Sequence, residues 1–230
     1  MRAAMRKRFD ASKDPDILRI EPWAFEQLAQ ALVYTDVFVF CMCEEDNLLN
    51  QWRVYGKDTV PICIGYPVKT FQQEFDYYRF EIMPMLYDEA LQIRIIDACV
   101  DIGLQHAITH KAALRSDDDL KSFIENWISI GVDWCIRLKH PQFAVEKEWR
   151  LAIRWGLEHR TFQARHFRSS PSGIVPYLKM KPTNGALDMW SITIGPCRYP
   201  EIHQRTMHEF LYQHYQAHAE VHMSNLPIRV

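Results

Sequence analysis

The chain has 230 residues, of which 48% are hydrophobic, and this is enough to bury one sizeable core in a single domain. Its 27 basic and 29 acidic residues give a formal charge of −2, so the net charge does not indicate nucleic-acid binding, although a local basic patch stays open. The basic N-terminus is followed by "FDASKDPD" and not by an apolar run, so neither a secretory signal nor a membrane span is predicted.

The hydrophobic pattern predicts an α+β fold. Residues 1–20 are charged and unpatterned, and we expect a poorly ordered lead-in there, followed by a single α+β domain over residues 21–230. Antiparallel or mixed strands with helices inserted between them, one of the helices long and central, are typical of this class. The predicted elements are a helix at 21–34, a strand at 37–42, a helix ending at Gly56, strands at 60–66 and 78–82, helices at 87–103 and 120–138, strands at 146–155, 177–180 and 187–194, a helix at 199–218 and a strand at 219–223.

The stretch "LLNQWRVYG" combines an apolar helix face with polar residues. Leu48, Leu49, Trp52 and Tyr55 share one face at helical spacing, while Arg53 points away from most of that face. One interpretation is a helix that packs on the sheet, with an arginine paired to a neighbouring carboxylate. The other is a site in which Arg53 and the Tyr55 hydroxyl contact an anionic ligand, because the guanidinium fork binds carboxylate or phosphate.

The strand "EKEWRLAIRW" has the clearest alternation in the chain. One face carries Trp and aliphatic residues, and the other carries Glu148, Arg150 and Arg154. If the polar face meets solvent, it is an ordinary charged ladder. If another element covers it, Glu148 must be paired or change its pKa, and a Glu beside an Arg can then act as a general base.

Histidine and cysteine spacing gives little support for a metal site. His106 and His110 are four residues apart, as are His214, His218 and His222, which is the spacing of two zinc ligands on one helical face. Neither group has a carboxylate or cysteine nearby at ligand spacing, so we expect no metal, and no motif indicates a particular cofactor. The six cysteines lie scattered, mostly in apolar runs, which favours a reducing, cytoplasmic location.

Seven short motifs occur in an order that resembles a widespread bacterial family with a domain of unknown function. They are "CMCEED", "LLNQWRVYG", "VPICIGY", "HPQFAVEKEWRLAI", "RSSPSGIVPYL", "ITIGP" and "MSNLPIRV". The resemblance covers about residues 37–230 and implies an architecture and favoured positions, not a reaction. Those positions are Glu44, Trp52, Tyr55, Gly65, Glu148, Trp149, Arg150, Gly195, Pro196, Ser224 and Arg229. Residues 1–36 do not match the N-terminal segment of the N-D-P type that such proteins generally have.

Two functional hypotheses follow from these observations. The first is a polar cleft that binds a small anionic or nucleotide-like ligand, with group transfer or hydrolysis as its chemistry. Its candidate catalytic residues are Glu148 and Arg150, and its candidate ligand-binding residues are Glu44, Arg53, Tyr55 and Arg229. The second is a non-catalytic interaction module, in a defence or mobile-element system, whose Glu and Arg residues form a structural ion-pair network. The oligomeric state does not follow from the sequence.

Overall fold

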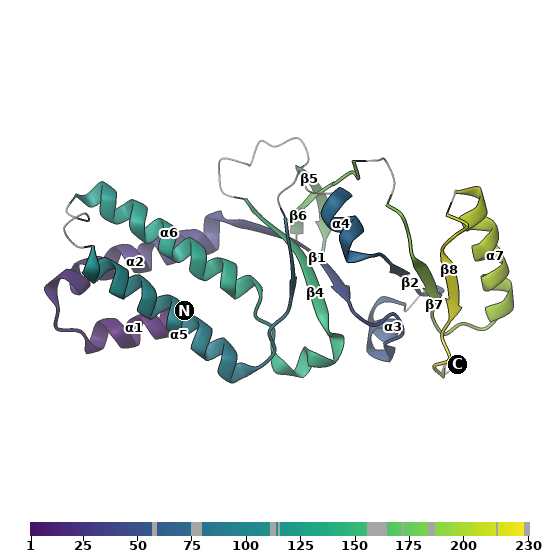
Figure 1. Cartoon of the computed structure of the whole chain (residues 1–230), viewed down its shortest axis with the longest axis horizontal. Helices are drawn as coiled ribbons and strands as arrows, with labels where there is room; N and C mark the ends of the chain where they lie inside the picture. Colours follow the sequence, from purple (N-terminus) through teal and green to yellow (C-terminus); the bar gives the residue numbers. More distant parts are fainter. Residues whose placement is uncertain are drawn as a thin grey trace. The chain divides into compact units, whose positions relative to one another are not determined.

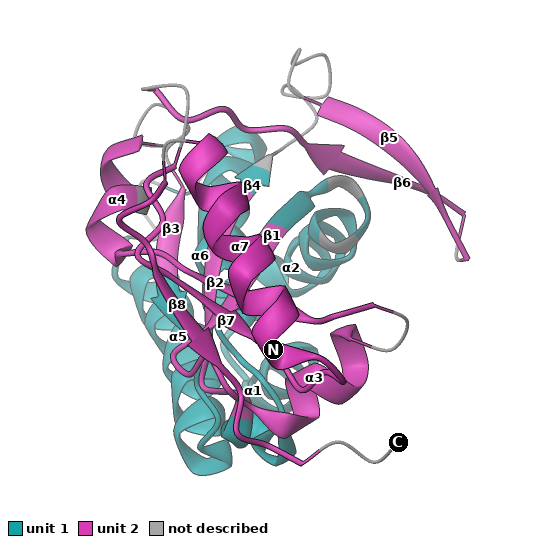
Figure 2. Ribbon diagram, turned by 90° about the vertical axis from the view of Figure 1, so that its right-hand side faces the viewer, with its two compact units in different colours: residues 1–38, 83–145, 154–162 teal, residues 39–82, 146–153, 163–230 magenta. Residues whose placement is uncertain are grey.

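The computed structural model confirms the α+β class (Figure 1). It describes residues 1–56, 59–74, 80–110, 114, 116–155, 165–171, 173–183, 187–214 and 216–227. The chain divides into two compact units, residues 1–38, 83–145 and 154–162 in unit 1 and residues 39–82, 146–153 and 163–230 in unit 2 (Figure 2). The single domain expected over residues 21–230 stays a prediction. In the described part of the chain, no helix is both long enough and apolar enough to cross a membrane.

Unit 1 is built mainly from helices. Their apolar faces form one core around Phe9, Ile124 and Trp127, and each of these side chains is buried. The helices of unit 1 are α1 (Arg2–Ala11), α2 (Pro15–Tyr34), α5 (Glu89–Thr109) and α6 (Asp117–Ile136), and a 3-10 helix, Pro141–Glu146, begins in this unit.

The first 20 residues differ from the expected poorly ordered lead-in. They form α1 and the beginning of α2, with Met5 and Phe9 buried four residues apart on one face of α1. Helix α2 begins at Pro15, because the Asp14 side chain accepts a hydrogen bond from the Asp16 backbone N–H and Pro fits the first turn. The helix predicted at 21–34 thus begins six residues earlier, and Pro22 lies inside it.

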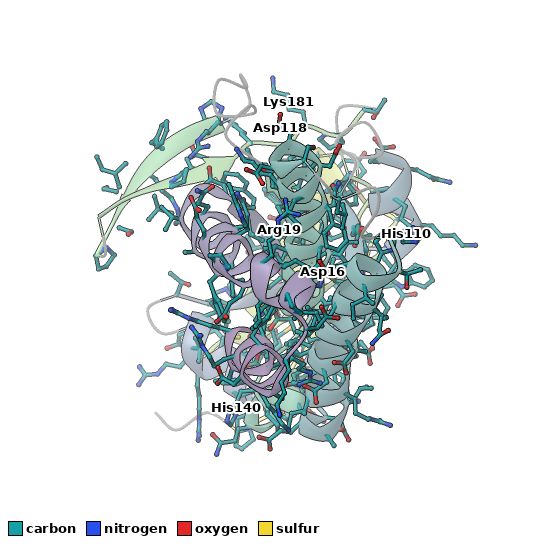
Figure 3. All side chains as sticks on the ribbon, turned by 90° about the vertical axis from the view of Figure 1, so that its left-hand side faces the viewer. Asp16, Arg19, His110, Asp118, His140 and Lys181 are labelled. Carbon is teal, nitrogen blue, oxygen red and sulfur yellow. The ribbon has the colours of Figure 1, made fainter. Side chains whose placement is uncertain are left out.

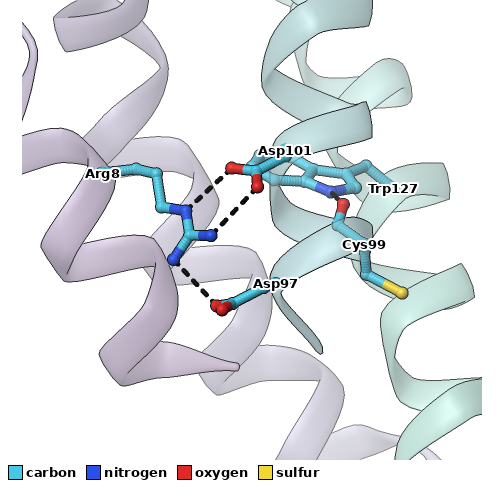
Figure 4. A network of polar contacts seen from close by, with 5 residues as sticks. All are labelled: Arg8, Asp97, Cys99, Asp101 and Trp127. Carbon is cyan, nitrogen blue, oxygen red and sulfur yellow. Dashed lines mark hydrogen bonds and ion pairs between the residues drawn. The ribbon is translucent and has the colours of Figure 1, made fainter. Parts of the chain in front are cut away.

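Two polar contacts join helices across unit 1. Arg8 of α1 binds both carboxylate oxygens of Asp101 on α5, at 2.8 Å and 3.0 Å, and Asp97 at 2.8 Å (Figure 4). The Trp127 indole N–H of α6 donates to the carbonyl oxygen of Cys99 at 2.8 Å. At the beginning of α6, the Arg19 guanidinium lies 3.1 Å from the Asp117 carboxylate. Figure 3 labels Arg19 and Asp118, the residue next to Asp117.

Unit 2 contains the β2–β7–β8 sheet, in which β2 is antiparallel to β7 and β7 is parallel to β8. Ile192, Ile194 and Leu211 form its core, because α7 covers one face of β7 and β8. The boundary between the units falls within all three strands of a further sheet, of order β1–β4–β3. The remaining elements are β1 (Asp36–Cys43), α3 (Leu49–Tyr55), β2 (Ile62–Gly65), α4 (Val68–Glu74), β3 (Glu81–Pro84), β4 (Glu148–Trp155), β5 (Arg165–Ser170), β6 (Gly173–Leu178), β7 (Ser191–Ile194), α7 (Pro200–Gln213) and β8 (Glu220–Met223).

The contact between α5 and α6 predicts the effect of a substitution at Gly103. A Cβ atom there would overlap the Trp127 indole, so Gly103→Ala should lower the free energy of unfolding by about 1–3 kcal/mol. Gly131→Ala is the matched control, because its Cβ would meet only the flexible end of the Met1 side chain, and alanine is the better helix former. Urea unfolding of both variants measures the difference. Equal stability of the two variants would contradict this packing.

The Arg8 contact predicts a dependence on pH. Arg8 holds the pKa of Asp101 below its ordinary value through their hydrogen bond. A lowered pKa in the folded state stabilises the protein above the unfolded pKa, and the effect is lost as the pH falls through the folded pKa. Arg8→Met should therefore cost at most about 1 kcal/mol at neutral pH, since Asp101 is more than half exposed. The difference from wild type should shrink as the pH falls below about 4, the ordinary pKa of an aspartate.

Urea unfolding at several pH values measures this difference. Arg94→Met on the same helix α5 is the control, since Arg94 is exposed, and its effect should not change over that pH range. A wild-type advantage over Arg8→Met that stays constant down to pH 3 would contradict the role given to Asp101.

Candidate functional site

Trp52 fixes α3 to the β2–β7–β8 sheet of unit 2. Its side chain is buried, and its indole ring lies so close to Gly195 that a Cβ atom there would be 3.0 Å from ring atom Cε3. The same Cβ would also meet the ring of Pro61, just before β2. A glycine at 195 is therefore required for this approach, which explains Trp52 and Gly195 as packing positions.

The loop before α3 is held by hydrogen bonds to three parts of unit 2. The Asn47 side-chain oxygen accepts from the Trp52 indole N–H at 2.9 Å and from the Ser224 hydroxyl at 2.6 Å. The Asn47 amide donates to the Asn225 side-chain oxygen at 3.2 Å. Next to it, the hydroxyl of the buried Thr193 donates to the carboxylate of Asp46. These contacts explain why "LLNQWRVYG" lies near the "ITIGP" and "MSN" motifs.

Glu148 and Arg150 form a charged pair on β4. The Arg150 Nε donates to Glu148 Oε1 at 2.6 Å. The Arg150 side chain is 21% exposed and the Glu148 side chain is 7% exposed. Ala152 lies on the same face of β4 as Glu148 and Arg150 and is also buried. Leu151 is buried on the opposite face. The face that carries Glu148 is therefore covered and is not an exposed charged ladder.

The Cys41 thiol of β1 lies within electrostatic reach of this pair. Burial raises the pKa of Cys41, and hydrogen bonding to Glu148 and its negative charge raise it further, while Arg150 acts in the opposite direction. The sulfur is therefore a protonated thiol at neutral pH and not an activated nucleophile. No local sequence pattern indicates this neighbour, because the contact between β1 and β4 depends on strand pairing.

Two further contacts join β4 and the residue before it to the segment that follows β1. The Trp149 indole N–H donates to Glu44 Oε1 at 2.7 Å, and Lys147 contacts Glu45. Lys147 has a left-handed backbone with φ of 42°, and its carbonyl oxygen accepts from the Glu44 N–H at 3.3 Å. Glu44 is thus placed beside β4, but through its contact with Trp149.

The other candidate residues are arranged differently. Arg53 and Tyr55 are exposed on α3, Tyr55 at 79%, and within the described residues no hydrogen bond or ion pair joins either of them to Glu148. Arg229 lies outside the residues that the structure describes. The structure thus brings together Cys41, Glu148 and Arg150. The ligand roles of Glu44, Arg53, Tyr55 and Arg229 stay predictions.

The histidines occupy separate contacts. His106 and His110 lie side by side, with ring centroids 4.3 Å apart, near the end of α5, and Figure 3 labels His110 there. His218 lies 2.6 Å from Asp188, His222 lies 3.3 Å from Glu220, and His214 packs on Phe210. Among the described residues, no group of three or more His, Cys, Asp or Glu side chains could hold a metal ion.

The fold defines the class of the protein, which is α+β. Residues 51–151 match the model of the family described as "Protein of unknown function (DUF2971)", which confirms the resemblance to a family of this kind. The matched range includes Trp52, Glu148 and Arg150. No curated protein and no solved structure matches the chain.

The Asn47 contacts predict a loss of stability when they are removed. Asn47→Ala leaves the N–H of the buried Trp52 without its acceptor, so we expect the free energy of unfolding to fall by about 1–3 kcal/mol. Asn50→Ala within α3 is the control and should change stability by less than about 0.5 kcal/mol. Chemical denaturation compares the two. A change at position 50 as large as that at position 47 would contradict the proposed role of Asn47.

Proposed function

We propose that the protein binds a small anionic or nucleotide-like ligand through Arg150, which Glu148 holds in place. The observation that carries this proposal is the 2.6 Å contact between a buried carboxylate and an arginine that keeps about one fifth of its side-chain surface exposed. A guanidinium fixed in this way offers a charged, planar group in one orientation, which suits phosphate or carboxylate recognition.

Stability alone gives little reason for such a pair. Two charges lose their hydration when they are buried, and an apolar pair of similar volume is often as stable or more stable. The neighbouring side chains Leu151 and Ala152 show that this part of β4 accommodates small and apolar residues. The cost of burying Glu148 is more readily explained if Arg150 must be held in one orientation for binding.

A group-transfer or hydrolytic reaction at this site would divide its roles between the same two residues. Glu148 would accept a proton from the attacking hydroxyl or water as the new bond forms, and Arg150 would hold the negative charge of the transferred group. As the bond to the leaving group breaks, Glu148 would return that proton to the leaving group. The Cys41 thiol is not assigned as nucleophile, because its pKa is raised. We place the protein in the bacterial cytoplasm, since all six of its cysteines are free, which fits a reducing compartment.

The burial of Glu148 also favours a second candidate function, a non-catalytic interaction module of a defence or mobile-element system. In this alternative the contacts of Glu148, Glu44 and Glu45 with Arg150, Trp149 and Lys147 form a structural network that fixes β4 against the segment after β1. The two candidates differ in whether Arg150 contacts a ligand.

A thermal-shift screen tests the proposal. Inorganic phosphate, nucleotides and NAD are added separately to wild type, Glu148→Gln, Arg150→Lys and Arg205→Lys. Arg205 is an exposed residue of α7, and its variant is the matched control. A ligand at about 100 times its dissociation constant adds about 2.7 kcal/mol, which should raise the midpoint of wild type by about 5 °C.

Wild type and Arg205→Lys should both show this shift, and Arg150→Lys and Glu148→Gln should lose it, since lysine cannot reproduce the fork. The unliganded midpoint of Glu148→Gln should stay nearly unchanged. If no compound shifts wild type and both β4 variants melt far lower, the ligand proposal fails and the interaction module is favoured.

A further inference from the structure

The hairpin of β5 and β6 has a charge pattern opposite to that of the whole chain. Residues 165–183, "RHFRSSPSGIVPYLKMKPT", contain four basic residues and no acidic residue, whereas the chain has a net charge of −2. The basic residues are Arg165, Arg168, Lys179 and Lys181. The overall charge therefore conceals a local basic segment, and a polyanion would meet this segment without a compensating carboxylate inside it.

Aromatic side chains lie next to the basic ones along the hairpin. The register pairs His166 with Tyr177 and Phe167 with Pro176, so the two aromatic groups occupy opposite faces of the ribbon. On one face the His166 and Tyr177 rings lie 5.6 Å apart. On the other, the Arg165 guanidinium lies over the Phe167 ring, 5.6 Å from its centroid. Each face thus offers an aromatic surface next to positive charge.

The hairpin is exposed and makes its main contacts within itself. Phe167 is 62% exposed and Ile174 is 79% exposed, and β5 packs chiefly on β6 (Figure 2). In Figure 2 the pair extends as a two-stranded ribbon away from α7 of the same unit. Arg168 and Lys179 are exposed too, and none of the described residues forms an ion pair with either of them.

We propose that this hairpin binds single-stranded nucleic acid. Proteins that bind single strands combine positive charge, which follows the phosphates, with aromatic side chains on which bases stack. Arg168 shares the face of His166 and Tyr177, so Arg168 and the nearby Lys179 supply the charge and Tyr177 supplies the stacking surface. This proposal rests on unit 2 residues outside the Glu148 and Arg150 pair, so it does not depend on the small-ligand function.

The chemistry of the hairpin tip disfavours a membrane as the partner. The described residues around the tip include Ser169, Ser170 and Gly173, and the Ser170 hydroxyl donates to the Gly173 carbonyl oxygen at 3.1 Å. A hairpin that inserts into lipid would place apolar side chains at its tip, because polar groups are costly in hydrocarbon. A duplex could admit a two-stranded ribbon into its major groove, but stacking on exposed rings requires unpaired bases.

Fluorescence anisotropy with the full chain tests this proposal. The probes are labelled 20-nucleotide single-stranded DNA and RNA and a duplex of the same sequence, and vesicles of anionic lipid are tested by co-sedimentation. The charge variant is Arg168→Glu with Lys179→Glu, and its matched control is Arg94→Glu with Lys121→Glu, two exposed positions on α5 and α6. The stacking variant is Tyr177→Ala, with Tyr212→Ala on α7 as its control.

We expect single strands to bind more tightly than the duplex, with affinity that falls as salt rises. The charge variant should reduce the slope of log affinity against log salt by about 1.4, which corresponds to two lost phosphate contacts. Tyr177→Ala should weaken binding about fivefold or more. The proposal is overturned if no single strand binds at low salt, or if a variant and its control lose the same amount of affinity for the single strand. Binding to vesicles alone would also overturn it, in favour of a membrane surface as the partner.

Discussion

The packing of Trp52 on Gly195 is the contact on which the arrangement of unit 2 depends. The indole ring closely approaches the backbone just after β7 because residue 195 has no side chain, and the indole N–H donates to Asn47. Asn47 in turn binds Ser224, just after β8. One apolar contact and its hydrogen bonds therefore fix a helix, two strands and a loop together, and the family-like motifs that meet here need no catalytic role to explain their presence.

In β4, by contrast, packing does not explain the most unusual feature, which is the burial of the charged Glu148 side chain. Leu151 and Ala152 satisfy the core, but Glu148 is buried as a charged partner of Arg150 next to the Cys41 thiol. Charges are buried in proteins when they are paired, and a pair with one partly exposed member leaves the exposed charge in a fixed orientation. Within unit 2, Trp52 therefore has a packing role, whereas Arg150 is the candidate contact to a ligand.

The sequence was sufficient for the α+β class and for most strands, since alternation over residues such as 148–155 is local information. The sequence did not predict features that depend on contacts between residues far apart in the chain. Met5 and Phe9 became core residues only because other helices cover α1, and the charged residues around them hid that face. The strand β5 was missed because "RHFRSS" has no apolar alternation and depends on pairing with β6. Likewise, the sequence showed that Glu148 was polar, but not that it was covered.

The two proposed anion-binding sites should respond differently to salt, because they differ in solvent exposure. Arg150 is mostly buried against Glu148, where mobile ions screen its charge weakly and a ligand gains from a fixed geometry. Arg168 and Lys179 are exposed on a hairpin, where attraction to phosphates arises largely from counterion release and weakens steeply with salt. A single polyanion that bound both sites would show both dependences together. Ligands specific to one site would separate them, and the salt dependence of binding therefore assigns an anion to the β4 pair or to the hairpin.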